Sequence, residues 1–318
     1  MSEIAEKYEQ VGSNWLQNHA VSAADQAVMA AMRPQVLPNK GKMRGIAARP
    51  VFEAILARNA TATGVSFREG SIGGVPGWWC EPPEARAEGV LLHLHGGWFG
   101  WGSAAGFRPL VSQLALATGL RAFIPDYRLA PEHPFPSGPQ DVERCYLGLL
   151  EQQAGPVVVS GDSAGGNLAL SLLVSLAQRR DVRPPACAFV LSPVTDLTQS
   201  GASWQSRAEA DPFFVFEQAA SMIAAYLDGH AAADPAVSPL FASLANLPPV
   251  RIHVGDDEML LDDSIRFAER AVAAGVDARV DVWQGMPHGF VGGIGQFEAA
   301  SLAVKAIGGF VEGRLGAV

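Results

Sequence analysis

The 318-residue sequence predicts an α/β fold with a mostly parallel central sheet flanked by helices. Two observations carry this prediction. From residue 89 onward, short β-branched or aliphatic runs alternate with longer segments of helical periodicity, which is typical of right-handed crossovers between parallel strands. Hydrophobic residues make up 48% of the chain and charged residues only 17%, so the composition supports a large buried core. Open α/β sheets commonly reach this length as one domain.

The alternation places six strands and five helices after residue 89. The strands are expected at Val90 to His95, Arg121 to Pro125, Pro156 to Gly161, Ala186 to Ser192, Val250 to Gly255 and Ala278 to Trp283. The helices are expected near 103–118, 140–153, 164–179, 262–274 and 295–313. Residues 62–80 predict leading antiparallel strands, because Gly73-Gly74 and Pro76-Gly77 mark turns.

Two segments do not follow this alternation of strands and helices: residues 1–55 and residues 196–240. The first predicts helices with an apolar face, and the second is rich in large apolar side chains. These residues are Ala23, Val28, Met29 and Met32 in the first segment and Trp204, Phe213, Phe214, Phe216, Met222 and Tyr226 in the second. Ligands of open α/β sheets bind beyond the carboxyl ends of the strands. We therefore expect a helical cap from 1–55 and 196–240 on a core of 56–195 and 241–318. The alternative is that both segments pack against a flank of the sheet.

The net charge of −9 argues against nucleic acid or an anionic membrane as a main partner. The basic cluster Lys40, Lys42 and Arg44 is then expected to be a solvated loop. The three cysteines cannot all pair and lack metal-binding spacing, which favours a reducing compartment without a metal site; they are Cys80, Cys145 and Cys187. The N-terminus lacks an apolar signal region and no later stretch has the length of a membrane span. The sequence thus predicts a cytoplasmic protein without stable membrane insertion.

A candidate nucleophile lies at Ser163, in the run Gly161-Asp162-Ser163-Ala164-Gly165. An apolar strand precedes this G-x-S-x-G turn and a helical run follows it. A sharp strand-to-helix turn exposes a serine hydroxyl to a base, and the glycines relieve crowding in the turn. The N–H of Ala164 is a candidate oxyanion donor. The alternative is an ordinary turn.

A glycine-rich loop, Gly96-Gly97-Trp98-Phe99-Gly100-Trp101, follows the first central strand. Its bare N–H groups are expected to complete an oxyanion hole. The glycines do not have the G-x-G-x-x-G spacing of a dinucleotide site, so no such cofactor is expected. Close packing is the alternative role for this loop.

His288 is the expected general base, because it occupies the loop after the last predicted strand, at the sheet edge where Ser163 also emerges. His93 and His133 are expected to be structural, whereas His95 lies where it can orient the glycine loop by hydrogen bonds.

The triad acid is expected at the end of the preceding strand, where Asp256, Asp257 and Glu258 all offer carboxylates. Asp262 and Asp263 are expected instead to cap the following helix. The order serine, acid, histidine is that of α/β-hydrolases.

Several motifs in this order resemble the hormone-sensitive-lipase-like (bacterial family IV) esterases of the α/β-hydrolase fold, over roughly residues 20–315. They are His95-Gly96-Gly97, residues 126–136, residues 161–167, Pro248-Pro249 and residues 285–290. The resemblance implies ester hydrolysis without a cofactor, a lid from the two irregular segments, and oxyanion donors at Gly96, Gly97 and Ala164. It also implies a possible homodimer. Counting from Pro248 as the family does places the acid at Glu258, with Asp257 as the alternative one residue earlier.

The chain departs from the family pattern at Trp98, which replaces the last small residue of the glycine loop. With Phe99 and Trp101, this ring favours a compact aromatic pocket over a long acyl tunnel; core packing is the alternative for Phe99 and Trp101. The expected function is a serine carboxylesterase for short-chain or small bulky esters. Lactonase, amidase or carbamate hydrolase activity on the same triad stays open, as does a non-catalytic binding protein like the gibberellin receptors, which lack a working histidine.

Overall fold

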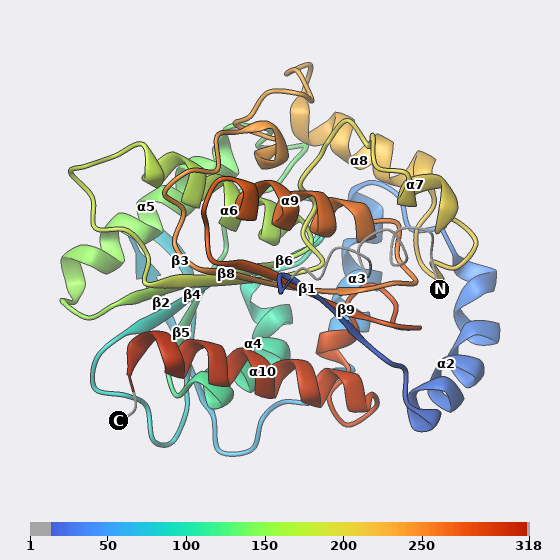
Figure 1. The fold of residues 1–318 in the computed structure, drawn as a ribbon, viewed down its shortest axis with the longest axis horizontal. Coiled ribbons are helices and arrows are strands. Elements are labelled where there is room, and N and C mark those ends of the chain that lie inside the picture. Colours follow the sequence, from blue (N-terminus) through green and yellow to red (C-terminus); the bar gives the residue numbers. More distant parts are fainter. Residues whose placement is uncertain (1–13, 317–318) are drawn as a thin grey trace.

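The computed structural model describes residues 14–316 and places a nine-stranded sheet at the centre of the molecule (Figure 1). The strand order is β1-β9-β8-β7-β6-β4-β5-β3-β2. The strands are β1 (Leu16–His19), β2 (Ser66–Ile72), β3 (Val75–Glu81), β4 (Val90–Leu94), β5 (Arg121–Pro125), β6 (Val157–Asp162), β7 (Cys187–Leu191), β8 (Val250–Gly255) and β9 (Ala278–Trp283). The antiparallel pairs in this sheet are β2–β3 and β3–β5, so β3 alone runs opposite to the other eight strands. The predicted α/β class is therefore confirmed.

All six strands expected after residue 89 are present, with ends shifted by at most one residue. Their side chains are almost all buried, as the apolar runs of a parallel sheet covered on both faces require. The antiparallel pair expected in 62–80 is the hairpin β2–β3, in which Ile72 pairs with Val75 across Gly73 and Gly74.

Helices cover both faces of the sheet (Figure 1). On one face lie α5 (Ser137–Gln152), α6 (Ala164–Ala177) and α9 (Leu261–Ala273), and on the other lie α4 (Ala104–Thr118) and α10 (Glu298–Leu315). Each begins and ends close to the predicted position. Two buried clusters fill the space between helices and sheet, one on each side of it.

The first 55 residues are not all helical, which corrects the expectation for this segment. Residues Leu16–His19 form β1, which adds to the edge of the sheet parallel to β9. His19 stacks on Trp283 with ring centroids 4.0 Å apart and bonds to Asp281 at 2.7 Å. These partners stabilise a strand whose own sequence has little β propensity. The expected helices of residues 1–13 lie outside the described residues.

The remaining elements of the two irregular segments contact each other. The first segment contains α2 (Ala23–Val36), η1 (Leu37–Asn39), η2 (Ile46–Ala48) and α3 (Arg49–Leu56), and the second contains α7 (Ser203–Ser206), α8 (Phe216–Leu227) and η3 (Pro239–Phe241). Gly41 N–H donates to Phe213 O at 3.1 Å, and Gln218 Nε2 donates to Met43 O at 2.7 Å.

The first irregular segment also contacts loops that leave the carboxyl ends of the strands. Arg49 donates to Gly100 O at 2.7 Å, in the loop after β4, and to Ala130 O at 3.0 Å, after β5. Arg33 of α2 pairs with Asp257 after β8 at 2.5 Å. The first segment therefore lies near the carboxyl ends of the strands, where the candidate residues emerge, and the second segment contacts the first.

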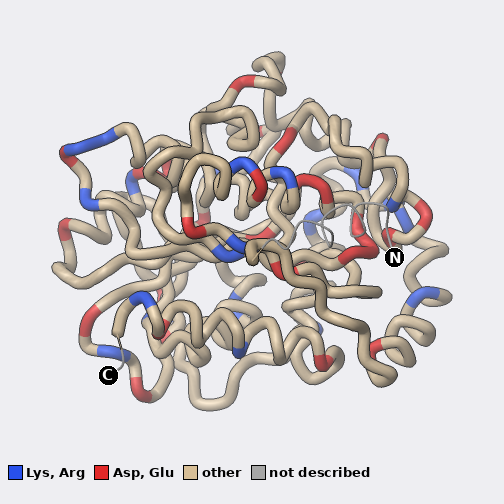
Figure 2. The backbone as a smooth tube through the Cα atoms, viewed as in Figure 1, with Lys and Arg blue, Asp and Glu red and all other residues tan. Residues whose placement is uncertain are grey.

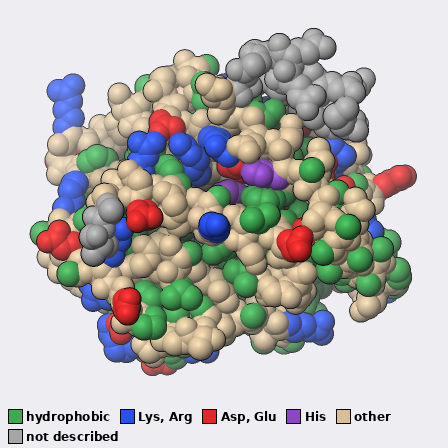
Figure 3. Space-filling model, turned by 60° about the horizontal axis from the view of Figure 1, so that its bottom comes forward, with side chains coloured by type: hydrophobic (Ala, Val, Ile, Leu, Met, Phe, Trp, Pro, Cys, Tyr) green, Lys and Arg blue, Asp and Glu red, His purple; other side chains and the backbone are tan. Residues whose placement is uncertain are grey.

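Charged residues of both signs are interspersed along the chain (Figure 2), and the face in Figure 3 shows small apolar patches among charged side chains. Cys80, Cys145 and Cys187 are all free and buried. Burial raises the pKa of each thiol to about 12, so these cysteines act as packing groups. No helix within residues 14–316 is both long and apolar enough to cross a lipid bilayer.

Candidate active site

Candidate residues follow four of five adjoining parallel strands, at the carboxyl ends of those strands. In sheet order the five strands are β9, β8, β7, β6 and β4, and no residue predicted from the sequence follows β7. His288 follows β9, Glu258 follows β8, Ser163 follows β6 and Gly96 follows β4. Because parallel strands end at the same edge, residues distant in the sequence meet there.

Ser163 occupies a strained turn between β6 and α6, with φ 54° and ψ −119°. Strain of this kind costs about 1–3 kcal/mol and persists only where the surroundings hold it. Its N–H donates to Leu191 O at 2.8 Å, and its carbonyl accepts from Val194 N at 3.1 Å. A Cβ added at Gly165 would lie 1.9 Å from Leu94 O. The motif glycine is therefore required by the close approach of β4.

Glu258 contacts the candidate base, and Asp257 does not. Glu258 Oε2 lies 2.7 Å from His288 Nδ1, and the carboxyl group is completely buried. Its other oxygen, Oε1, accepts from Ser192 Oγ at 2.7 Å and from Gly255 N at 2.6 Å. Asp257 is instead paired with Arg33. The geometry thus favours Glu258 over the alternative one residue earlier.

His288 has only 12% of its side chain exposed. Burial lowers the pKa of this imidazole, but the charge and hydrogen bond of Glu258, with the charges of Asp211 and Asp162, outweigh burial and raise the pKa above its usual value. Asp162 directly precedes Ser163, so its influence on His288 indicates that the serine and the base share one neighbourhood. No hydrogen bond joins Ser163 Oγ to His288 within residues 14–316, and such bonds are often formed only when substrate is bound.

One hydrogen bond to a side chain and one between backbone groups fix the histidine loop (residues 284–289) against the acid loop (residues 256–260). Asp256 Oδ1 accepts from Gly285 N at 2.6 Å, and Asp257 N donates to Met286 O at 3.2 Å. The third carboxylate of the acid loop therefore positions the histidine loop rather than the imidazole itself.

In the glycine loop, the structure corrects the prediction that Gly96 is an oxyanion donor. The N–H of Gly96 donates to Asp162 Oδ1 at 2.9 Å, so this group is occupied. The N–H groups of Gly97, Trp98 and Ala164 have no acceptor within the described part of the chain. Both Gly97 and Trp98 have positive φ, 117° and 52°. The available donors are therefore shifted by one residue along the loop.

His95, which was expected to orient this loop by hydrogen bonds, and His93, which was expected to be structural, both lie next to the start of the loop. His95 Nδ1 bonds to Gly96 O at 2.9 Å, and its ring stacks on Tyr127 with centroids 4.4 Å apart. His93 is fully buried and bonds to Ser160 Oγ at 2.9 Å. His133 lies on the exposed surface.

The three aromatic residues of the glycine loop are all buried, with different neighbours. Trp98 packs edge-to-face on Phe214 at 5.2 Å, and Phe214 packs edge-to-face on His288 at 5.0 Å. Phe99 stacks on Tyr226 of α8 at 3.8 Å. Trp101 donates its indole N–H to Gly45 O at 2.7 Å. Of the three, Trp98 is the one whose ring is linked to His288 through a single intervening ring, that of Phe214.

Sequence reasoning missed Ser192 and Asp211. Ser192 follows β7, which lies between the nucleophile and acid strands, so its position at a strand end was an available signal. Asp211 is fully buried and accepts from Phe213 N, Phe214 N and Met259 N at 2.9–3.1 Å. Burial, partly offset by these bonds, raises the pKa of Asp211. No local pattern marks this residue.

Asp262 and Asp263 lie in the first turn of α9, but they do not cap it. The carboxylate of Asp262 accepts from Ser203 N at 3.0 Å, and that of Asp263 accepts from Thr195 N at 2.7 Å. Both therefore attach the segment after β7 to α9, which corrects the capping expectation.

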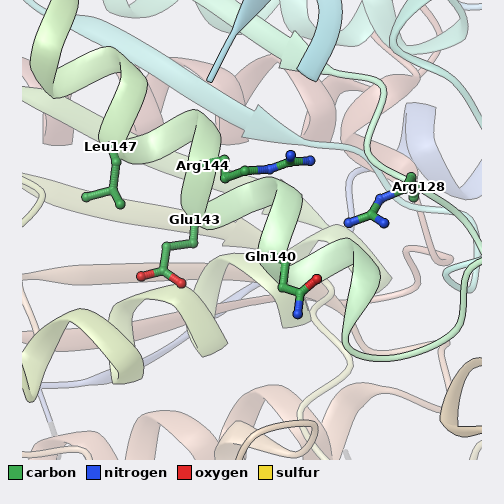
Figure 4. Close-up of a pocket in the computed structure, with 5 residues that line it drawn as sticks. All are labelled: Arg128, Gln140, Glu143, Arg144 and Leu147. Atoms are coloured by element: carbon green, nitrogen blue, oxygen red, sulfur yellow. The ribbon is translucent and has the colours of Figure 1, made fainter. Parts of the chain in front are cut away.

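A surface pocket at α5 contains none of the candidate active-site residues. It is lined by Arg128, Gln140, Glu143, Arg144 and Leu147 (Figure 4). Both arginines already bind Asp141. The pocket therefore offers no unpaired positive charge. Within residues 14–316, no group of three or more His, Cys, Asp or Glu side chains is arranged to hold a metal ion.

The sheet order and the serine, histidine and carboxylate at its edge define an α/β hydrolase, and residues 91–292 match the family model of the alpha/beta hydrolase fold. An esterase of Acinetobacter venetianus is 36% identical over 256 residues, covering 80% of this chain and 84% of that protein. An acetyl-hydrolase of Streptomyces hygroscopicus is 37% identical over 215 residues, covering 66% and 70%. The crystal structure of an esterase from the bacterial hormone-sensitive lipase family superposes with a TM-score of 0.86 at 34% identity, covering 94% and 100%.

The chain belongs to the hormone-sensitive-lipase-like α/β hydrolases, and it is a carboxylic ester hydrolase.

Proposed function

We propose that the protein hydrolyses short-chain or small bulky carboxylic esters through an acyl-enzyme on Ser163. The observation that carries this proposal is the buried 2.7 Å contact between His288 Nδ1 and Glu258, which leaves Nε2 as the nitrogen that takes the serine proton. The carboxylate holds the required tautomer and stabilises the imidazolium that forms.

In the first step Ser163 Oγ attacks the ester carbonyl while its proton passes to His288 Nε2. The oxyanion accepts hydrogen bonds from the N–H groups of Gly97, Trp98 and Ala164, which have no other acceptor among residues 14–316. One such donor is worth about 3–4 kcal/mol of transition-state stabilisation. His288 then returns the proton to the leaving alcohol, and water cleaves the acyl-enzyme by the same route in reverse.

The aromatic wall supports a small substrate. Trp98 replaces a small residue, and its fully buried ring, with that of Phe214, fills volume beside the base. A compact pocket of this kind excludes long acyl chains by sterics.

The test compares hydrolysis of p-nitrophenyl acetate and p-nitrophenyl octanoate by the wild type and by Ser163→Ala. We expect the wild type to favour the acetate and the variant to lose activity on both. Absence of wild-type activity on either ester, or full activity of the variant, would contradict the proposal.

A further inference from the structure

Two buried tryptophans beside the candidate site have indole N–H groups without an acceptor within residues 14–316. They are Trp98 and Trp204, each 2% exposed, with ring centroids 6.4 Å apart. Leaving a buried donor unsatisfied costs about 1–3 kcal/mol, and native proteins rarely do so without a reason. An acceptor supplied by a ligand would provide that reason.

The other indoles of this region are satisfied. Trp101, three residues after Trp98 in the same loop, donates to Gly45 O at 2.7 Å. Trp283 donates to His253 Nδ1 at 3.3 Å. Of these four indoles, therefore, only those of Trp98 and Trp204 lack an acceptor within residues 14–316; Tyr226 Oη, on the ring that stacks against Phe99, is another buried polar atom without a partner there.

The position of Trp98 connects this pair to the reacting ester. Its backbone N–H is one of the proposed oxyanion donors, and its ring reaches His288 through the single ring of Phe214. A substrate whose carbonyl binds the Trp98 amide therefore has its flanking groups near the side chain of the same residue.

We propose that the indole N–H groups of Trp98 and Trp204 select esters that carry a second acceptor oxygen near the scissile bond, as an ether, hydroxyl or carbonyl group. This inference rests on the proposed function. An alkyl ester of the same size leaves the donors unsatisfied, whereas an oxygenated one accepts from them. A site with a buried donor discriminates against ligands that lack the matching acceptor. The second oxygen belongs to either the acyl or the alcohol part.

Two pairs of isosteric esters distinguish whether the second oxygen lies in the acyl part or in the alcohol part. The two esters of each pair differ only by the exchange of one CH2 group for oxygen. The acyl arm compares p-nitrophenyl methoxyacetate with p-nitrophenyl butanoate. The alcohol arm compares 2-methoxyethyl acetate with butyl acetate, followed by titration of released acid. The measured quantity is the ratio of kcat/KM within a pair, in the wild type and in Trp98→Phe. Intrinsic reactivity cancels when one pair is compared across variants.

Within each pair, the ratio is kcat/KM for the oxygenated ester divided by kcat/KM for the alkyl ester. We expect Trp98→Phe to lower this ratio about five- to tenfold in at least one arm, which is the effect of one net hydrogen bond. The backbone N–H of residue 98 is retained, so the oxyanion donors persist. Trp101→Phe is the matched control, because it removes a satisfied indole from the same loop, and its ratios should stay at the wild-type value. Ratios within twofold of wild type in both arms, for both Trp98→Phe and Trp204→Phe, would overturn the inference.

A binding measurement keeps the test valid if Trp98→Phe does not fold. Ser163→Ala labelled with ¹⁵N is titrated with methyl methoxyacetate and with methyl butanoate. We expect an indole N–H resonance to move downfield with the first ester only, and equal response to both would refute the inference. If the wild type hydrolyses p-nitrophenyl acetate and the ratios do not change, this inference fails while the proposed function stands. If it hydrolyses no ester, the proposed function itself fails.

Discussion

Replacing Glu258 by glutamine tests the proposed acid with almost no change in shape. Oε1 of Glu258 accepts from two donors, Ser192 Oγ and Gly255 N–H, whereas Oε2 has His288 Nδ1 as its one hydrogen-bond partner in the described part of the chain. A glutamine must therefore keep its oxygen at the Oε1 position and place its NH2 group against the imidazole. That NH2 donates to Nδ1, so the ring proton moves to Nε2. In this tautomer Nε2 cannot accept the proton of Ser163.

The expected loss in kcat for Glu258→Gln is about 10⁴-fold, the typical effect of a wrong tautomer in a serine triad. It corresponds to about 5.4 kcal/mol of activation free energy. The matched control is Asp257→Asn, which changes the neighbouring carboxylate in the same way but weakens only the pair with Arg33. We expect that variant to retain kcat within about tenfold, because a partly exposed ion pair is worth about 1 kcal/mol or less.

The assay is turnover of p-nitrophenyl acetate, with enzyme concentration taken from absorbance and folding checked by circular dichroism. A Glu258→Gln variant that keeps kcat within tenfold of wild type would refute the assignment. A large loss in Asp257→Asn alone would instead identify Asp257 as the acid.

Three further predictions follow from the same contacts. The raised pKa of His288 places the acid limb of the kcat/KM profile at higher pH than an unperturbed imidazole would, and activity falls as the pH falls through that pKa. Asp211→Asn removes one negative charge that raises the pKa of His288, so it should move this limb to lower pH. A limb that does not move would count against this coupling. Gly165→Ala should prevent folding or lower the melting temperature steeply, because the added Cβ would clash with the carbonyl oxygen of Leu94. Gly309→Ala in α10 is the control: its Cβ has no neighbour within 4 Å, so it should stabilise the protein by about 0.5–1 kcal/mol in thermal unfolding. Equal behaviour of the two variants would contradict the packing argument. Arg33→Gln should lower kcat less than tenfold while reducing thermal stability, and a loss of 10³-fold would show that the α2 contact is part of the reaction machinery.

The sequence predicted the strands and the serine turn because both depend on local patterns. Apolar runs of five or six residues gave the strand positions, and the glycines around Ser163 reflect a close approach that any such turn requires. The histidine and the acid loop could be placed because both follow strands that end at one edge.

The corrected features depend on contacts between distant residues. β1 has the sequence Leu-Gln-Asn-His, and its strand conformation comes from pairing with β9 about 260 residues later. The N–H of Gly96 is occupied by Asp162 from another strand, so only the assembled sheet shows that the free donors begin at Gly97. The orphaned indoles of Trp98 and Trp204 likewise become visible only when the neighbours of each side chain are known.

Mass spectrometry after treatment with an organophosphate ester, diethyl p-nitrophenyl phosphate, tests most directly whether Ser163 is the nucleophile. The account predicts one diethylphosphoryl group on the peptide that contains Ser163, appearing in step with the loss of esterase activity, and no label at this peptide in Ser163→Ala. Inactivation with the label on another residue, or undiminished activity with Ser163 fully labelled, would contradict it.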